Sequence, residues 1–177
     1  MSTEAARPLV FVTVGTERYP FARLVDWVDA WAATERGRAA RCFVQYGAGR
    51  PPAAAEGVDF LPFPRMRELL GASTAVVCHG GTGSVMLARY LGRKPIVVPR
   101  VKSFGENVDD HQVEFARRLR SLGEAEMAES FDELSAFLDA AATGARSFTA
   151  AADGAHVADA VARFEAAVGR LVPRGRG

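Results

Sequence analysis

Short apolar runs without polar alternation recur along this chain of 177 residues, and most are followed by a glycine-containing turn and then by a helical pattern. Such runs are typical of strands that helices cover on both faces, as in parallel sheets. Six strands are predicted, at residues 9–14, 41–46, 58–63, 75–78, 95–98 and 125–128. We therefore expect an α/β fold, a Rossmann-like parallel sheet with helices on both faces.

Apolar residues at spacings of three and four predict the helices between these strands. The predicted helices cover residues 21–31, 64–70, 84–91, 109–122 and 132–142. We expect residues 1–150 to form this domain, and residues 151–177 to form a further helix with a basic tail. The final helix, from about Asp153, carries a narrow apolar stripe of Val157, Val161, Phe164, Val168 and Leu171. This stripe either packs on the chain's own sheet or docks on a partner.

The composition disfavours several classes of protein. Lysine and arginine number 22 against 21 aspartate and glutamate residues, so no overall field draws the chain to nucleic acid or anionic lipid. No apolar stretch approaches the roughly 20 residues that span a bilayer. The two cysteines, Cys42 and Cys78, fall in predicted buried strands, where reduced thiols pack as small hydrophobes, and a cytosolic location is expected.

A glycine-rich turn, HGGTGS at residues 79–84, lies between the fourth predicted strand and its helix. Its glycines allow close approach to the backbone, and hydroxyl groups beside a helix N-terminus suit a diphosphate held without a metal ion. The turn is not a dinucleotide fingerprint, because it reads HGGTGS and not GxGxxG. It is not a Walker motif either, because no lysine follows it. A tight corner between strand and helix is the alternative. The candidate diphosphate-binding residues are His79, Gly80, Gly81, Thr82, Gly83 and Ser84.

Three further loops are expected at the same edge, because the carboxyl ends of parallel strands lie together and ligands bind there. They are the turn at Gly15 and Thr16, the turn at Gly47 and the loop after Val98. The sequence therefore predicts one site built from four loops.

The turn at residues 79–84 resembles the donor-site turn of GT-B glycosyltransferases, in particular the family 28 C-terminal domain, and the HxGxxS turn of plant-type nucleotide-sugar transferases. FVTVGT, residues 11–16, is similar to the start of the small catalytic subunit of the UDP-N-acetylglucosamine transferase of asparagine-linked glycosylation. HGGTGSVMLARYLGRKPIVVPR, residues 79–100, followed by FGENVDDHQ, residues 104–112, resembles the small subunit of bacterial two-component exopolysaccharide glycosyltransferases. The resemblance covers roughly residues 9–122.

The resemblance implies the nucleotide-binding half of a split GT-B enzyme, with a separate membrane-associated subunit that supplies the acceptor half. The donor would be a UDP-sugar, without cofactor or metal, and the acceptor a lipid-linked saccharide reached through the partner. The chain would be cytoplasmic, and peripheral at the inner face of the membrane through that partner. The resemblance also implies that Gly15 and Thr16 line the donor cleft, that residues 79–84 hold the diphosphate, and that His111 and Gln112 face the sugar.

Two positions depart from the family pattern. A glutamate that binds the ribose hydroxyls in many relatives is Leu87 here, so ribose recognition must come from elsewhere. A histidine of the exopolysaccharide subunits is replaced by Asn107. The missing glutamate supports an alternative function, a non-catalytic module of the same fold that stabilises a membrane-associated glycosyltransferase partner.

Inverting transfer needs a base that takes the proton of the acceptor hydroxyl and a group that stabilises the leaving diphosphate. The candidate bases are Glu106, Asp109, Asp110 and His111. Two adjacent aspartates at the start of a helix, such as Asp109 and Asp110, are also typical of N-cap residues. A base that the partner subunit contributes is an equal alternative. Arg100 and Lys102 are candidates for two roles. They could add positive charge at the phosphates, or they could bind the carboxylate of a donor uronic acid. Both residues are also compatible with ordinary solvated charges.

The sequence therefore predicts the donor-binding catalytic subunit of an inverting, UDP-sugar-dependent glycosyltransferase that elongates a lipid-linked saccharide, in exopolysaccharide or related glycan synthesis. The non-catalytic module remains the alternative. An oxidoreductase is disfavoured, because the first predicted strand lacks GxGxxG.

Overall fold

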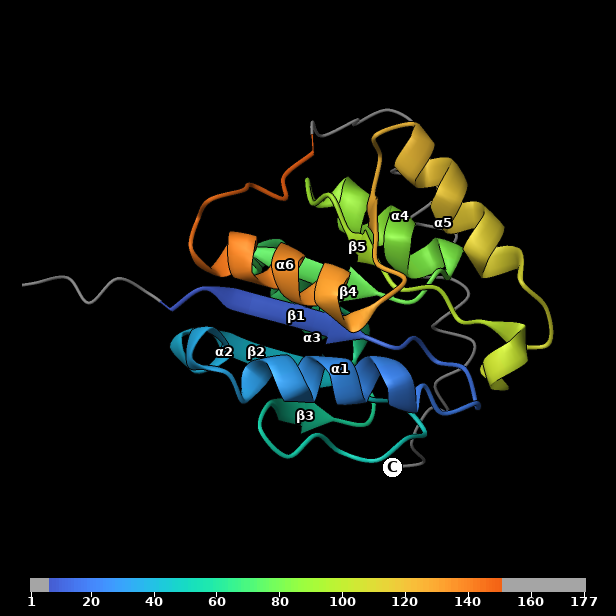
Figure 1. The fold of residues 1–177 in the computed structure, drawn as a ribbon, viewed down its shortest axis with the longest axis horizontal. Coiled ribbons are helices and arrows are strands. Elements are labelled where there is room, and N and C mark those ends of the chain that lie inside the picture. The colour runs from blue at the N-terminus through green and yellow to red at the C-terminus, as the bar shows by residue number, and fades with distance from the viewer. Residues whose placement is uncertain (1–6, 151–177) are drawn as a thin grey trace, which may run out of the picture.

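In the computed structural model, which describes residues 7–150, the strands pair in the order β3-β2-β1-β4-β5-β6 and every pairing within this sheet is parallel (Figure 1). The strands are β1 (Leu9–Thr13), β2 (Arg41–Gln45), β3 (Glu56–Val58), β4 (Ala75–Cys78), β5 (Ile96–Val97) and β6 (Glu126–Met127). The chain runs outward from β1 to β3, returns to β4 beside β1, and then runs outward the other way. In a doubly wound sheet, ligands bind at the carboxyl ends of the two strands where the order reverses. Here these strands are β1 and β4.

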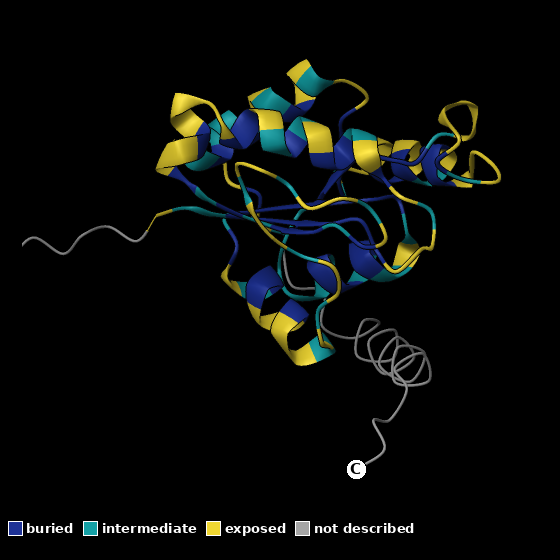
Figure 2. Cartoon of the chain, turned by 90° about the horizontal axis from the view of Figure 1, so that it is seen from below, coloured by how far each residue is buried: buried dark blue, intermediate teal, exposed yellow. Residues whose placement is uncertain are grey.

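Helices cover both faces of the sheet, so the predicted fold class is confirmed. They are α1 (Ala22–Ala32), α2 (Glu35–Ala39), α3 (Phe63–Ala72), α4 (Thr82–Tyr90), α5 (His111–Ser121) and α6 (Phe131–Ala142), with a 3-10 helix η1 (Lys102–Phe104). In Figure 1, α1, α2 and α6 lie in front of the sheet, and α3 and α4 lie behind it. Figure 2 shows the buried strands between the two helix layers, whose outward faces are exposed.

The core follows the alternation of side chains along β1. Val10 and Val12 pack with buried side chains of α1 and α6, including Trp31. Phe11 points to the opposite face and packs with α3 and α4, including Leu87. Because both sides of the strand are buried, β1 reads as an uninterrupted apolar run rather than an alternating one.

Some predicted boundaries are wrong. The third strand was expected at residues 58–63 but ends at Val58, and α3 begins at Phe63. Pro62 is the N-cap and Pro64 lies in the first turn, where the missing N–H of proline is tolerated. The helix α2 and the 3-10 helix η1 were not predicted. The predicted helix from Asp153 and the basic tail lie outside the described residues.

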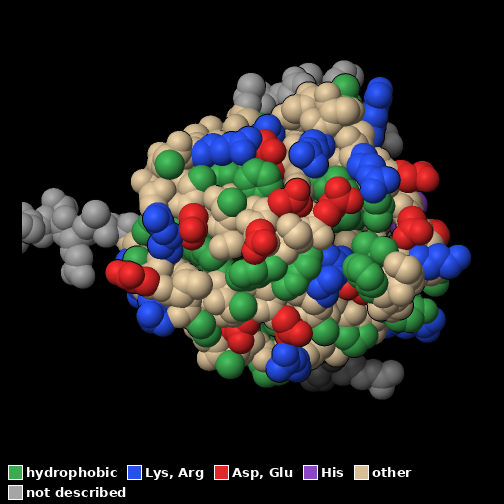
Figure 3. All heavy atoms as spheres, in the orientation of Figure 1, with side chains coloured by type: hydrophobic (Ala, Val, Ile, Leu, Met, Phe, Trp, Pro, Cys, Tyr) green, Lys and Arg blue, Asp and Glu red, His purple; other side chains and the backbone are tan. Residues whose placement is uncertain are grey.

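Basic and acidic side chains are interspersed on the face shown in Figure 3, in line with the formal net charge of +1. Within residues 7–150, no helix has the length and apolar character needed to cross a bilayer. Four large apolar side chains are exposed in this part of the chain: Phe60, Phe104, Val108 and Leu122. Two of them, Phe104 and Val108, belong to the segment between β5 and α5.

Candidate functional site

His79 directly follows β4, and its imidazole lies between two glycines from different loops. A Cβ atom on Gly15 would lie 2.3 Å from Cε1 of His79, and one on Gly81 would lie 2.1 Å from its Nε2. Gly15 also has a φ of +79°, which side-chain-bearing residues rarely adopt. The loop after β1 and the turn after β4 therefore meet around one imidazole, at the point where the strand order reverses.

The imidazole of His79 is buried, and its Nδ1 atom has no hydrogen-bond partner. Burial and, to a smaller extent, the nearby positive charge of Arg100 together lower the pKa of His79 to about 4. The imidazole is therefore neutral at physiological pH. Because buried polar atoms are nearly always satisfied in folded proteins, this unpartnered nitrogen requires an explanation.

The helix α4 begins beside this imidazole, with Gly81 as its N-cap and no side chain capping its first turn. The backbone N–H groups at a helix N-terminus have no intrahelical partner and carry partial positive charge. Thr82 is exposed at this end, whereas Ser84 is largely buried. Such a terminus can bind an anion such as a phosphate.

The side-chain amide of Gln112, in the first turn of α5, holds the turn in place. Its Oε1 atom accepts hydrogen bonds from the backbone N–H of Gly80 at 3.1 Å and of Arg100 at 3.2 Å. A Cβ atom on Gly80 would lie only 2.8 Å from Cβ of Gln112, so this glycine permits the close approach of α5. The side-chain carbonyl oxygen of Gln112 thus joins two loops inside the protein, and the expected position of this residue at the sugar stays a prediction.

Two polar side chains that the sequence analysis did not single out fix the backbone at Gly15. The hydroxyl of Thr13 accepts a hydrogen bond from the Gly15 N–H at 3.1 Å, and Nε2 of Gln45 donates to the Gly15 carbonyl at 3.2 Å. Both side chains are buried at the ends of apolar strands. A buried-strand pattern that ends in a polar residue was the signal that could have identified them.

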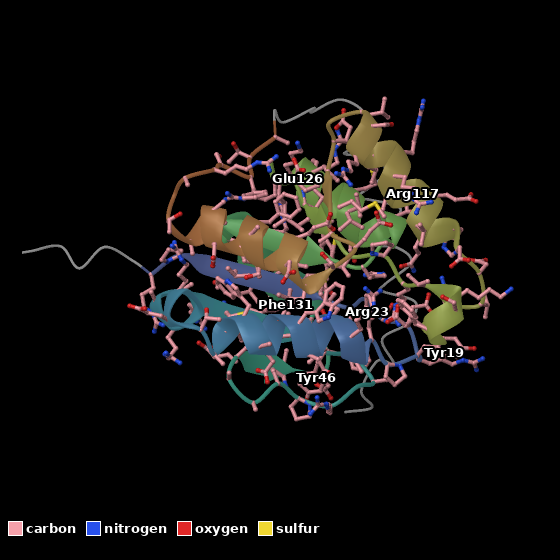
Figure 4. All side chains as sticks on the ribbon, in the orientation of Figure 1. Tyr19, Arg23, Tyr46, Arg117, Glu126 and Phe131 are labelled. Carbon is pink, nitrogen blue, oxygen red and sulfur yellow. The ribbon has the colours of Figure 1, made fainter. Side chains whose placement is uncertain are left out.

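The expected bases have different environments. Both carboxylate oxygens of Glu106 contact Arg23 of α1, each at 2.8 Å, and one also accepts from the Val101 N–H. Asp110 accepts a hydrogen bond from the Lys102 N–H at 2.8 Å. Glu106 and Asp110 thus shape the loop between β5 and α5. In Figure 4, Arg23 lies on the side of the molecule where this loop passes.

The expected base His111 is exposed, and the carboxylate of Asp109, another candidate, lies at one of its ring nitrogens. Its Nδ1 atom contacts Oδ1 of Asp109, which also accepts a hydrogen bond from the His111 N–H. These interactions with His111 lower the pKa of Asp109, so the carboxylate is ionised. Asp110 occupies the N-cap position of α5 without a side-chain cap bond, whereas the carboxylate of Asp109 binds the first backbone N–H of the helix.

Arg100, expected near the phosphates, is fully buried beneath the loops that follow β1 and β5, while Lys102 is exposed. A cavity of about 410 Å³ opens between α1, α5 and η1, and its lining includes Arg23, Phe104 and Arg117. No group of three or more His, Cys, Asp or Glu side chains within residues 7–150 is arranged to hold a metal ion.

The order of the strands and the glycine turn at their reversal define a Rossmann-like domain of the kind found in GT-B glycosyltransferases. The model of the glycosyltransferase family 28 C-terminal domain matches residues 9–164, and the chain belongs to this family. A search of curated protein sequences found no significant match.

Solved structures of glycosyltransferases share the fold. The kitacinnamycin glycotransferase is 18% identical with a TM-score of 0.56, and the calicheamicin glycosyltransferase CalG4 is 20% identical with a TM-score of 0.55. Each match covers 96% of this chain but only 41% and 45% of those proteins, so the chain spans less than half of their length. The solution structure of ALG13 is 18% identical with a TM-score of 0.56, and the match covers 90% of this chain and 96% of ALG13.

Proposed function

We propose that the chain binds a nucleoside diphosphate sugar, specifically a UDP-sugar, and serves as the donor-binding half of an inverting glycosyltransferase. One observation carries this proposal: the imidazole of buried His79 lies against Gly81, the N-cap residue of α4, and this end of the helix has no side-chain cap. A diphosphate placed there can accept hydrogen bonds from the helix N-terminal amides and from an imidazole N–H. Membership of the glycosyltransferase family supports the same assignment.

In this proposal the turn stabilises the leaving group. Negative charge grows on the diphosphate as the bond to the sugar breaks, and fixed amide dipoles favour that charge. Thr82 and Ser84 add hydroxyl donors at the same end of α4, and the glycines at 80, 81 and 83 let the phosphates approach the backbone. Gly15 and Thr16 form the opposite wall of the donor cleft.

We assign the base to His111. The acceptor hydroxyl oxygen attacks the anomeric carbon of the donor, and the bond from this carbon to the diphosphate breaks, with its electron pair leaving on the diphosphate oxygen. The hydroxyl proton passes to Nε2 of His111. Asp109, which contacts Nδ1, fixes the tautomer and stabilises the imidazolium that forms. Glu106 and Asp110 are less suited, because their carboxylates bind within the loop.

The acceptor half is proposed to be a separate, membrane-associated chain that presents a lipid-linked saccharide at the cytoplasmic face, in exopolysaccharide or related glycan synthesis. The structural similarity to ALG13, with a TM-score of 0.56, supports this proposal. The exposed side chains of Phe104 and Val108 lie in the loop that leads to His111, and they suit contact with such a partner.

One observation favours the alternative, a non-catalytic module that stabilises a glycosyltransferase partner. Leu87, at the position of the family's ribose-binding glutamate, is 1% exposed and packs in the core with Phe11. This position therefore offers no donor contact. A module of this kind would keep the fold but would not bind nucleotide.

Calorimetric titration of the purified chain with UDP separates the two functions. The wild type is expected to bind UDP and His79→Ala to lose binding, because the diphosphate then lacks its imidazole donor. His111→Asn serves as the matched control, since its imidazole is assigned to the acceptor side, and it should bind UDP like the wild type. A folded wild type that binds no UDP would refute the donor role and favour the module.

A further inference from the structure

Arg100 is a buried cation without an ion pair. Its side chain is 0% exposed, although arginine is seldom fully buried, and among residues 7–150 no carboxylate pairs with it. The nearest acidic side chains that act on it are Glu17 and Glu106, and the carboxylate of Glu106 is held by Arg23. The positive charge of Arg100 is thus not neutralised by a direct partner.

Backbone carbonyls and an aromatic ring take the place of that partner. The guanidinium donates to the carbonyl oxygens of Val14 and Tyr19 at 3.0 Å and of Glu106 at 3.2 Å, and more weakly to Pro20 at 3.4 Å. It also lies over the ring of Phe21, 4.6 Å from the centroid. One side chain therefore holds the loop after β1 against the loop after β5, on both sides of His79.

We propose that Arg100 is the fixed cation of the diphosphate site, a positioning residue that acts from beneath the loops and keeps His79 as a neutral hydrogen-bond donor. This inference rests on the donor-binding role proposed above. Three features combine in it: the complete burial of the guanidinium, its hold on both loops, and the lack of an ion-pair partner among the described residues. A buried charge is poorly screened, so it attracts an anion bound above it without touching that anion.

The charge of Arg100 and the charge state of His79 are linked. Of the charged side chains, Arg100 acts on His79 directly, whereas Glu17 and Glu106 act on Arg100. Gln112, which packs against the turn from α5, is neutral. Burial is the main factor that keeps the imidazole of His79 neutral, and the charge of Arg100 adds to it, because a second cation would lie close to the first. The diphosphate is therefore bound by a permanent charge below and by neutral donors around it.

The test uses nuclear magnetic resonance of the imidazole nitrogens of His79 together with UDP calorimetry at pH 8. In Arg100→Met, which removes the charge, His79 should take up its second proton at higher pH than in the wild type, and UDP affinity should fall at least about tenfold. Arg100→Lys keeps the positive charge but lacks the planar guanidinium group that donates to several carbonyl oxygens. It should leave the titration of His79 near that of the wild type and weaken UDP binding less than the methionine variant does.

An unchanged His79 titration in Arg100→Met, or unchanged UDP affinity, overturns the inference. If Arg100→Met does not fold, the inference is tested with the wild type and Arg100→Lys, through the protonation state of His79 in the UDP complex. Saturating UDP at pH 6.5 should leave His79 singly protonated, and a doubly protonated imidazole in that complex would make His79 the cation and overturn the inference. Absence of UDP binding by the wild type refutes the donor role and, with it, a cation that serves a diphosphate. The histidine titration without nucleotide separately tests the effect of Arg100 on His79.

Discussion

The side chains of Arg23 and Glu106 form a bidentate ion pair in which both nitrogen-to-oxygen distances are 2.8 Å. The pair joins α1 to the loop between β5 and α5, because the carboxylate also accepts from the Val101 N–H and Arg23 donates to the Pro99 carbonyl. These residues are 83 positions apart in the chain. The pair therefore fixes the loop that carries the proposed base.

Arg23→Met should destabilise the protein by about 2 kcal/mol, because it leaves a largely buried carboxylate without its charged donor. The exposed pair of Arg41 and Glu56 offers a matched comparison, and Arg41→Met should cost less than about 1 kcal/mol. Urea unfolding at neutral pH measures both free energies of unfolding. Equal costs for the two variants would show that the buried pair has no special role.

Gly81→Ala should destabilise the protein by about 1–3 kcal/mol and abolish UDP binding, since the new methyl group would lie 2.1 Å from Nε2 of His79. The φ of Gly81 is −76°, so backbone strain does not contribute. In Gly71→Ala the methyl group meets no atom within 4 Å, and this helix substitution should stabilise the protein by up to about 1 kcal/mol. Chemical denaturation and calorimetry compare the two. Retained UDP affinity in Gly81→Ala would contradict the tight fit around His79.

The low pKa of His79 predicts how the contribution of this residue to the stability of the protein depends on pH. The pKa is about 4 in the folded state and near 6.5 in the unfolded state, so the unfolded state binds more protons between these values. Stability should therefore fall as pH drops from about 6.5 to about 4, by up to about 3 kcal/mol from this residue. His79→Gln removes the titrating group, and the difference between its pH profile and that of the wild type isolates the effect. Parallel profiles would show that His79 is not buried as a neutral imidazole.

Both cysteines should be unreactive in the native protein. Cys42 and Cys78 are buried, and burial raises the pKa of each thiol to about 12, so the reactive thiolate is scarce. A thiol reagent such as Ellman's reagent should label neither in buffer and both in 6 M guanidinium chloride. Rapid labelling of one thiol under native conditions would indicate local opening of the strand that carries it.

The sequence was informative where the fold obeys local rules. The alternation of apolar runs with helical patterns identified the parallel sheet, and because parallel strands end at one edge, it placed the loops at Gly15 and His79 together. The glycine pattern between a strand and a helix identified the turn at residues 79–84, and the family resemblance then implied its role. The apolar pattern gave the wrong bounds for the third strand, because the proline at position 62 is compatible with either the end of a strand or the start of a helix.

The environment of single side chains was not predictable in the same way. The partners of Arg100 are carbonyls up to 86 positions away, so no local pattern indicates that this cation is buried. The ion pair of Arg23 with Glu106 also depends on tertiary packing. Asp109 and Asp110 could not be distinguished from their sequence, and only the folded loop shows that Asp109 contacts His111 whereas Asp110 binds the Lys102 N–H.

The amide oxygen of Gln112 has a mechanical consequence for the site. Through this one atom the N–H groups of Gly80 and Arg100 are both joined to the first turn of α5. Any displacement of α5 must therefore move the turn at residues 79–84 and the segment after β5 with it, or break two buried hydrogen bonds. The groups assigned to the leaving phosphate and to the acceptor proton thus lie on a common rigid frame, and their spacing is set before any substrate arrives.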